Sequence, residues 1–139
     1  MYNLFLDDIR FPLDIYPNEE WVIVRDFDQF KSYIEENGLP DMVSFDNDLG
    51  LNIPEGYDAL KWMIANDIII TNIRVHSDNT VAAKQIEGLA NNWLKHLKSE
   101  GIIDDYNVSQ QFAMFLRKNP KISLYLEHWK TFLEIKNQD

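Results

Sequence analysis

The chain has 139 residues, of which 45% are hydrophobic and 13% aromatic, enough to build the core of one globular domain. It contains no cysteine, so disulfides, thiolate zinc sites and cysteine nucleophiles are excluded. Its net charge of −10 opposes broad binding to duplex DNA, although a small anionic ligand remains possible beside a local cation or metal.

The first half of the chain predicts three short strands and one helix. It begins MYNLFLDD, with neither a basic leader nor a long apolar segment, so we expect a cytoplasmic protein that does not bind or span a membrane. Asp26 stands where it can cap the helix, and Asn37-Gly38 is typical of a helix end. The predicted elements are strands at 2–6 and 21–26, a helix at 28–36 and a strand at 42–45.

The second half predicts two helices around a fourth strand, and then a weaker pattern. The longest helix carries an apolar stripe that begins at Val81. Residues 68–71 form either a lead-in to the fourth strand or a short extra strand. The predicted elements are a helix at 57–66, a strand at 73–76, a helix at 80–98, a short strand at 106–108, and helices at 110–117 and 122–135.

The alternation of strands with helices indicates βαβ units and a mainly parallel sheet. The expected fold class is therefore α/β with a mainly parallel sheet. We assign residues 1–100 to this α/β domain and residues 101–139 to a C-terminal helical extension packed on the same domain. Ligands of such sheets bind at the carboxyl ends of the strands.

Polar side chains follow three of the predicted strands at the point where each ends. Each group alone has an ordinary reading as a turn or a helix cap, but parallel neighbouring strands would bring all three to one edge. The coincidence therefore favours a functional site. The groups are Asp7, Asp8 and Arg10 after the first strand, Asp46 and Asp48 after the third, and His76, Ser77 and Asn79 after the fourth.

Several carboxylates within a few ångströms of one another need a counter-charge, and a hard divalent cation supplies it. We therefore expect Mg²⁺, or Mn²⁺, on Asp7, Asp8 and Asp46. Asp48 is either a fourth ligand or a group that orients His76.

The remaining polar residues suit phosphoryl chemistry. Arg10 can clamp a phosphate with its guanidinium, and Ser77 and Asn79 can donate hydrogen bonds to phosphate oxygens. His76 titrates near neutral pH and can act as a general acid or base. Asp46 is either a metal ligand or a nucleophile, so the catalytic candidates are Asp46, His76 and Arg10.

The order of these residues resembles that of a response-regulator receiver domain. Receivers have an acidic pair after the first strand, a phosphoacceptor Asp after the third and a Ser or Thr after the fourth. Asp7 with Asp8, Asp46 and Ser77 match that order. Receivers also carry a Lys after the fifth strand, and residues 106–112 offer no convincing counterpart.

A closer resemblance is to the cyclic-phosphate processing receiver domains, over about residues 3–98. It rests on LDDIRFP at 6–12, DNDLG at 46–50 and VHSDN at 75–79. The resemblance implies a receiver-like fold, with a flavodoxin-like three-layer α/β/α arrangement, and a metal-dependent phosphohydrolase that acts on a cyclic phosphate. The ligand would be a 2′,3′-cyclic phosphate at an RNA end or a cyclic nucleotide.

Two alternatives stay open. The chain could be a non-catalytic receiver-like module that binds a phosphate-bearing ligand or a protein partner, with the C-terminal helices as a partner or homodimer surface. It could also be a haloacid-dehalogenase-like phosphatase, although that family has its D-x-D motif on the first strand, followed by Thr or Val. Here the motif follows the third strand and Leu49 comes next.

Overall fold

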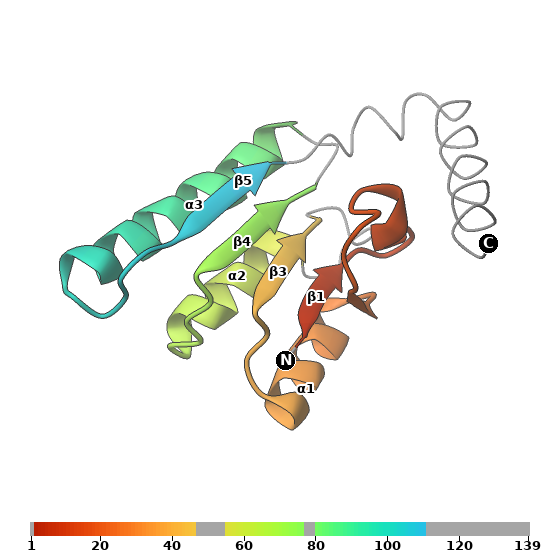
Figure 1. Cartoon of the computed structure of the whole chain (residues 1–139), viewed down its shortest axis with the longest axis horizontal. Coiled ribbons are helices and arrows are strands. Elements are labelled where there is room, and N and C mark those ends of the chain that lie inside the picture. The colour runs from red at the N-terminus through yellow and green to blue at the C-terminus, as the bar shows by residue number, and fades with distance from the viewer. Residues whose placement is uncertain (1, 47–54, 77–79, 111–139) are drawn as a thin grey trace, which may run out of the picture.

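The computed structural model describes residues 2–46, 55–76 and 80–110. Its centre is a five-stranded sheet in the order β2-β1-β3-β4-β5, in which every neighbouring pair is parallel (Figure 1). This topology confirms the receiver-like α/β class. The strands are β1 (Asn3–Leu6), β2 (Val22–Val24), β3 (Met42–Phe45), β4 (Asn72–Val75) and β5 (Asn107–Gln110).

Three α-helices follow strands β2, β3 and β4, and their bounds agree with the predicted ones to within one or two residues. The Asp26 side chain caps α1 as predicted, accepting a hydrogen bond of 2.8 Å from the backbone N–H of Gln29. Gly38 ends the helix with φ of 83°, a left-handed conformation that suits glycine. The helices are α1 (Phe27–Asn37), α2 (Gly56–Ala65) and α3 (Thr80–Ser99), and the β1–β2 connection holds only a short 3-10 turn, η1 (Pro12–Asp14).

The three α-helices of the described residues all lie on one side of the sheet, which we call the helix-side face, so this part of the chain forms two layers rather than the predicted three-layer α/β/α arrangement (Figure 1). Alternate strand residues point to this face, since successive side chains of a strand point in opposite directions. They pack with helix residues into the main core, which burial of apolar surface stabilises. Its fully buried members include Leu4, Leu6, Val43, Phe45, Ile73 and Val75 from the strands and Phe30, Leu60, Met63, Ile86, Ala90 and Leu94 from the helices.

The opposite side, which we call the loop-side face, is covered by the β1–β2 connection. Tyr16 and Trp21 of this connection pack edge-on against Phe5, with ring centroids 6.4 and 6.0 Å from that of Phe5. Arg74 of β4 lies with its guanidinium 4.8 Å from the centre of the Tyr16 ring and binds both carboxyl oxygens of Glu19, at 2.6 and 3.2 Å. This face therefore mixes aromatic and charged groups where the helix-side face is apolar.

The structure corrects two details of the predicted helices. Val81 is 66% exposed, because it lies five positions before the buried Ile86 and so about 140° around the helix from it. Gln110 is the last residue of β5 rather than the start of a helix.

Of the helical extension predicted at 101–139, the described residues 101–110 contribute β5 to the sheet, and residues 111–139 lie outside the described part of the chain. Residues 68–71 lead into β4 without forming a strand. Among the helices in the described part of the chain, none combines the length and hydropathy needed to cross a membrane.

Candidate functional site

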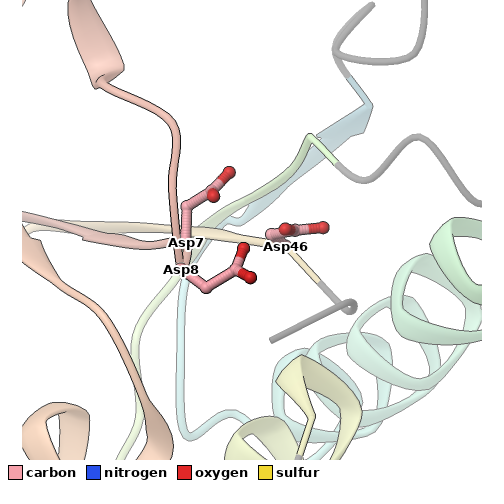
Figure 2. A group of neighbouring side chains, drawn as sticks. All are labelled: Asp7, Asp8 and Asp46. Atoms are coloured by element: carbon pink, nitrogen blue, oxygen red, sulfur yellow. The ribbon is translucent and has the colours of Figure 1, made fainter. Parts of the chain in front are cut away.

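Three carboxyl groups meet at the carboxyl edge of the sheet. Asp7 and Asp8 follow β1, and Asp46 follows β3, where its backbone N–H donates a 2.9 Å hydrogen bond to the carbonyl of Leu6. One oxygen from each of the three side chains lies within 4.8 Å of the others (Figure 2). Asp7 and Asp46 are fully buried, and Asp8 is partly exposed. The loops after β1 and β3 therefore bring their carboxyl groups together, as predicted.

The Asp7 carboxylate is held by several donors. Its Oδ1 atom accepts backbone hydrogen bonds from Ile9 and Arg10, at 3.0 and 2.9 Å, and its Oδ2 atom lies 3.1 Å from Nε2 of His76. Burial alone would raise the pKa of Asp7, but the bonds from His76, Arg10 and Ile9 outweigh it and hold the pKa at about 2. Asp7 is therefore ionised at neutral pH.

His76 lies behind this carboxylate and is fully buried. Its Nδ1 atom is 2.6 Å from Oγ of Ser44, and its ring stacks on Phe5 with centroids 4.3 Å apart and planes within 6°. Both ring nitrogens thus face protein groups. The predicted role of His76 as a general acid or base requires one of these nitrogens to reach the substrate, and it stays a prediction. Asp7 lies at Nε2, whereas Asp48, the residue offered by the sequence analysis to orient His76, lies outside the described residues.

Two residues that the sequence analysis did not select complete the surroundings of His76. Ser44 is fully buried in β3, and its Oγ lies 2.8 Å from the hydroxyl of Tyr16. Burial raises the pKa of Tyr16 to about 12, in spite of the hydrogen bond with Ser44 and the nearby charge of Arg74. One signal was available in the sequence, since Ser44 is the polar residue in the otherwise apolar strand MVSF.

Two arginines shape the loop after β1. Arg10 donates from Nη1 to the carbonyl of His76 at 2.8 Å, and the same nitrogen lies 3.7 Å from Oδ2 of Asp7. Arg25, which was not predicted, donates from Nη1 to the carbonyls of Asp7 and Arg10, at 3.0 and 2.6 Å. Its guanidinium also lies 4.9 Å from the centre of the Phe11 ring. Arg25 directly follows β2, so its place at the same edge of the sheet was the signal that could have found it.

The other predicted site residues, Asp48, Ser77 and Asn79, lie outside the described residues. Their assignments as a metal ligand and as phosphate-binding groups stay predictions.

A cavity of about 300 Å³ lies at the other end of the sheet, near the amino ends of β1 and β2. The residues that line it include none of the predicted site residues. It is lined by Tyr2, Asn3, Glu20, Trp21, Val22 and Asp41.

The donor set of the carboxyl edge fits a hard divalent cation. Asp7, Asp8 and Asp46 offer only carboxylate oxygens, the ligands that Mg²⁺ and Mn²⁺ prefer. Two of these acids are buried, and Arg10 approaches one of them, so a cation would relieve the remaining excess of negative charge.

Comparison with known proteins gives one match. The model of a family described as "Cyclic-phosphate processing Receiver domain" matches residues 2–92, which include strands β1 to β4 and all three predicted polar groups. Neither the curated proteins nor the solved structures contain a significant match.

Proposed function

The chain belongs to the family of cyclic-phosphate processing receiver domains, and from this premise we propose that it is a phosphohydrolase that opens a cyclic phosphate with the help of a divalent cation. The proposed substrate is a 2′,3′-cyclic phosphate at an RNA end or a cyclic nucleotide. The observation that carries the proposal is the group of three carboxylates, two of them buried, at the edge of the sheet where parallel α/β folds bind ligands.

In this proposal Asp7, Asp8 and Asp46 hold Mg²⁺ or Mn²⁺. When bound, such a cation polarises a phosphate oxygen and lowers the pKa of a bound water. Asp48 is proposed as a further ligand.

Arg10 brings positive charge to the same edge and is proposed to bind a phosphate oxygen, together with Ser77 and Asn79. Its side chain is 10% exposed, and its bond to the His76 carbonyl fixes the direction of the guanidinium. A planar guanidinium held in this way suits the geometry of a phosphate. Because His76 is buried against Asp7 and Ser44, it acts on Asp7 rather than on the substrate, and another group must protonate the leaving oxygen.

The burial of His76 favours a second candidate function. Without an accessible imidazole, the site lacks one group that hydrolysis would use, whereas binding does not need it. The alternative is a non-catalytic module that binds a phosphate-bearing ligand and signals to a protein partner or a second copy of the chain.

Turnover separates the two candidates. The purified chain is incubated with Mg²⁺ or Mn²⁺ and with 2′,3′-cyclic nucleotides, cyclic-phosphate-ended RNA, cyclic oligonucleotides and acetyl phosphate, and the products are resolved by ³¹P NMR. We expect opening of one cyclic phosphate, and its loss in Asp46→Asn. The matched control is Asp67→Asn, an exposed position with φ of 53° that asparagine tolerates.

The other outcomes are equally informative. Tight binding of one compound without reaction supports the non-catalytic module. A stable phosphate on Asp46 from acetyl phosphate, without turnover, supports a phosphoacceptor. If the chain neither binds nor converts any compound in the panel, the proposal is wrong.

A further inference from the structure

A chain of buried polar groups runs from the loop-side face to the candidate metal centre. It links the hydroxyl of Tyr16 to Ser44 at 2.8 Å, Ser44 to His76 at 2.6 Å, and His76 to Asp7 at 3.1 Å. We propose that Tyr16, Ser44 and His76 are positioning residues, which orient the Asp7 carboxylate so that it binds the cation. The inference rests on one part of the proposed function, namely that the carboxylates hold a divalent ion.

The direction of the hydrogen bonds follows from the chemistry of the end groups. An ionised carboxylate can only accept, so Nε2 of His76 must carry the proton that it shares with Asp7. In the neutral ring Nδ1 is then an acceptor, and the Ser44 hydroxyl donates to it. The Oγ atom of Ser44 is left to accept from Tyr16. Asp7 thus selects the tautomer of His76, and Ser44 and Tyr16 complete the chain of hydrogen bonds on the other side of the ring.

Hydrogen-bond donors of the protein occupy one side of the Asp7 carboxylate. Its Oδ1 atom takes two backbone N–H groups and its Oδ2 atom takes the imidazole N–H, so three donors fix the plane of the group. A carboxylate has about four lone-pair sites, so these three donors leave one, on Oδ2, for a cation held together with Asp8 and Asp46. Hydrogen-bonded supports of this kind commonly set the affinity of a metal ligand.

The surroundings of His76 make these bonds effective. Its ring is stacked on Phe5, and Phe5 in turn packs against Tyr16 and Trp21. Ser44 and His76 are fully buried, so water does not compete for their hydrogen bonds. Loss of the Ser44 hydroxyl would leave Nδ1 without this donor and release the ring from its fixed orientation.

The first test measures binding of Mn²⁺ alone to the full chain, by electron paramagnetic resonance of the free ion. Removing a hydrogen-bond partner of a metal ligand typically weakens metal binding by about 10–100-fold. We therefore expect the affinity for Mn²⁺ to fall within this range in His76→Leu and near its lower end in Ser44→Ala. Tyr16→Phe removes a single oxygen at the far end of the chain and should weaken binding by less than about 10-fold. The matched control is Tyr2→Phe, which removes a hydroxyl that bonds to the Gly38 carbonyl instead.

Two further readouts separate positioning from a general loss of stability. His76→Gln keeps an N–H that can reach Asp7, so it should recover part of the affinity that His76→Leu loses. In the metal-free wild-type chain, the N–H of His76 should give a slowly exchanging proton NMR signal, and Ser44→Ala should broaden it while Tyr2→Phe leaves it unchanged.

The outcomes distinguish the inference from the function on which it rests. If the wild-type chain binds Mn²⁺ and the folded Ser44→Ala and Tyr16→Phe variants bind it equally well, the inference is overturned and the proposed function stands. If the wild-type chain binds no Mn²⁺, both are overturned. Weaker binding in Ser44→Ala with normal binding in Tyr2→Phe supports the inference.

Discussion

The two faces of the sheet are built from the same strands but carry different kinds of residues. The helix-side face carries Leu4, Val43 and Ile73 and is sealed by three helices. At the next positions along the same strands, the loop-side face carries Phe5, Ser44 and Arg74, which are partners in the parallel register. Among the described residues, their contacts are with aromatic rings, a carboxylate and an imidazole.

A parallel sheet with helices on both faces has strands that read as continuous apolar runs. Here the β1–β2 connection contains a short 3-10 turn in place of a longer helix, and β3 and β4 carry the polar residues Ser44 and Arg74 among apolar ones. We infer that the helix-side face supplies most of the folding free energy, whereas the loop-side face orients the groups at the carboxyl edge.

The largest expected effect comes from making the same substitution on each face. Ile73 is fully buried on the helix side, and Ile73→Ala should lower the free energy of unfolding by roughly 2–5 kcal/mol. Ile23 pairs with Phe5 on the loop side and is partly exposed, so Ile23→Ala should cost about 1 kcal/mol or less. Urea denaturation measures both. Equal losses would contradict the proposed division between the faces.

The second-largest expected effect is the gain in the free energy of unfolding when the cation binds. A ligand present at 100 times its Kd stabilises the folded state by about 2.7 kcal/mol, so Mg²⁺ at that excess should raise the free energy of unfolding by this amount. Asp46→Asn should remove the increment, and Asp67→Asn should keep it. Ile73→Ala should reduce stability with and without Mg²⁺ alike, whereas Ser44→Ala should also shrink the Mg²⁺ increment. An increment that survives in Asp46→Asn would place the ion elsewhere.

The third effect is a pH dependence of the loop-side face. Tyr16 has a pKa of about 12 in the folded chain against 10.0 for an ordinary tyrosine, so the unfolded chain loses this proton first as the pH rises. Its contribution is complete below pH 10.0 and declines between pH 10.0 and about 12. By pH 11 the wild-type chain should lose about 1.4 kcal/mol more than Tyr16→Phe does. The free energy of unfolding of both chains is measured by urea denaturation over this pH range. If it falls equally in both, Tyr16 does not titrate in this way.

The smallest effect concerns Arg74 and Glu19. The pair is bidentate but partly exposed, with 19% and 33% of the two side chains accessible, so solvent weakens it. Arg74→Met should cost about 1 kcal/mol, including the lost contact with the Tyr16 ring. Glu19→Gln keeps that ring contact and should cost less. Thermal unfolding compares the two variants, and a larger loss in Glu19→Gln would contradict the expected order.

Sequence patterns predicted the fold because strand and helix periodicities are local. The acids at the strand ends could also be predicted to meet, since parallel strands bring their carboxyl ends to one edge. The hydrogen bonds of Ser44 with Tyr16 and His76 could not be predicted, because they join residues 28 and 32 positions apart and depend on which face each side chain takes. The burial of His76 could not be predicted for the same reason, since it depends on the stack of the imidazole on Phe5.

The bonds from Arg25 to the carbonyls of Asp7 and Arg10 have a kinetic consequence. They tie the loop that carries Asp8 to the end of β2 through protein groups alone. Because the loop is already shaped, capture of a cation should require no slow chain rearrangement. We expect the association rate to be limited instead by the departure of water from the hydrated ion, and so to be much faster for Mn²⁺ than for Mg²⁺, which dehydrates reluctantly.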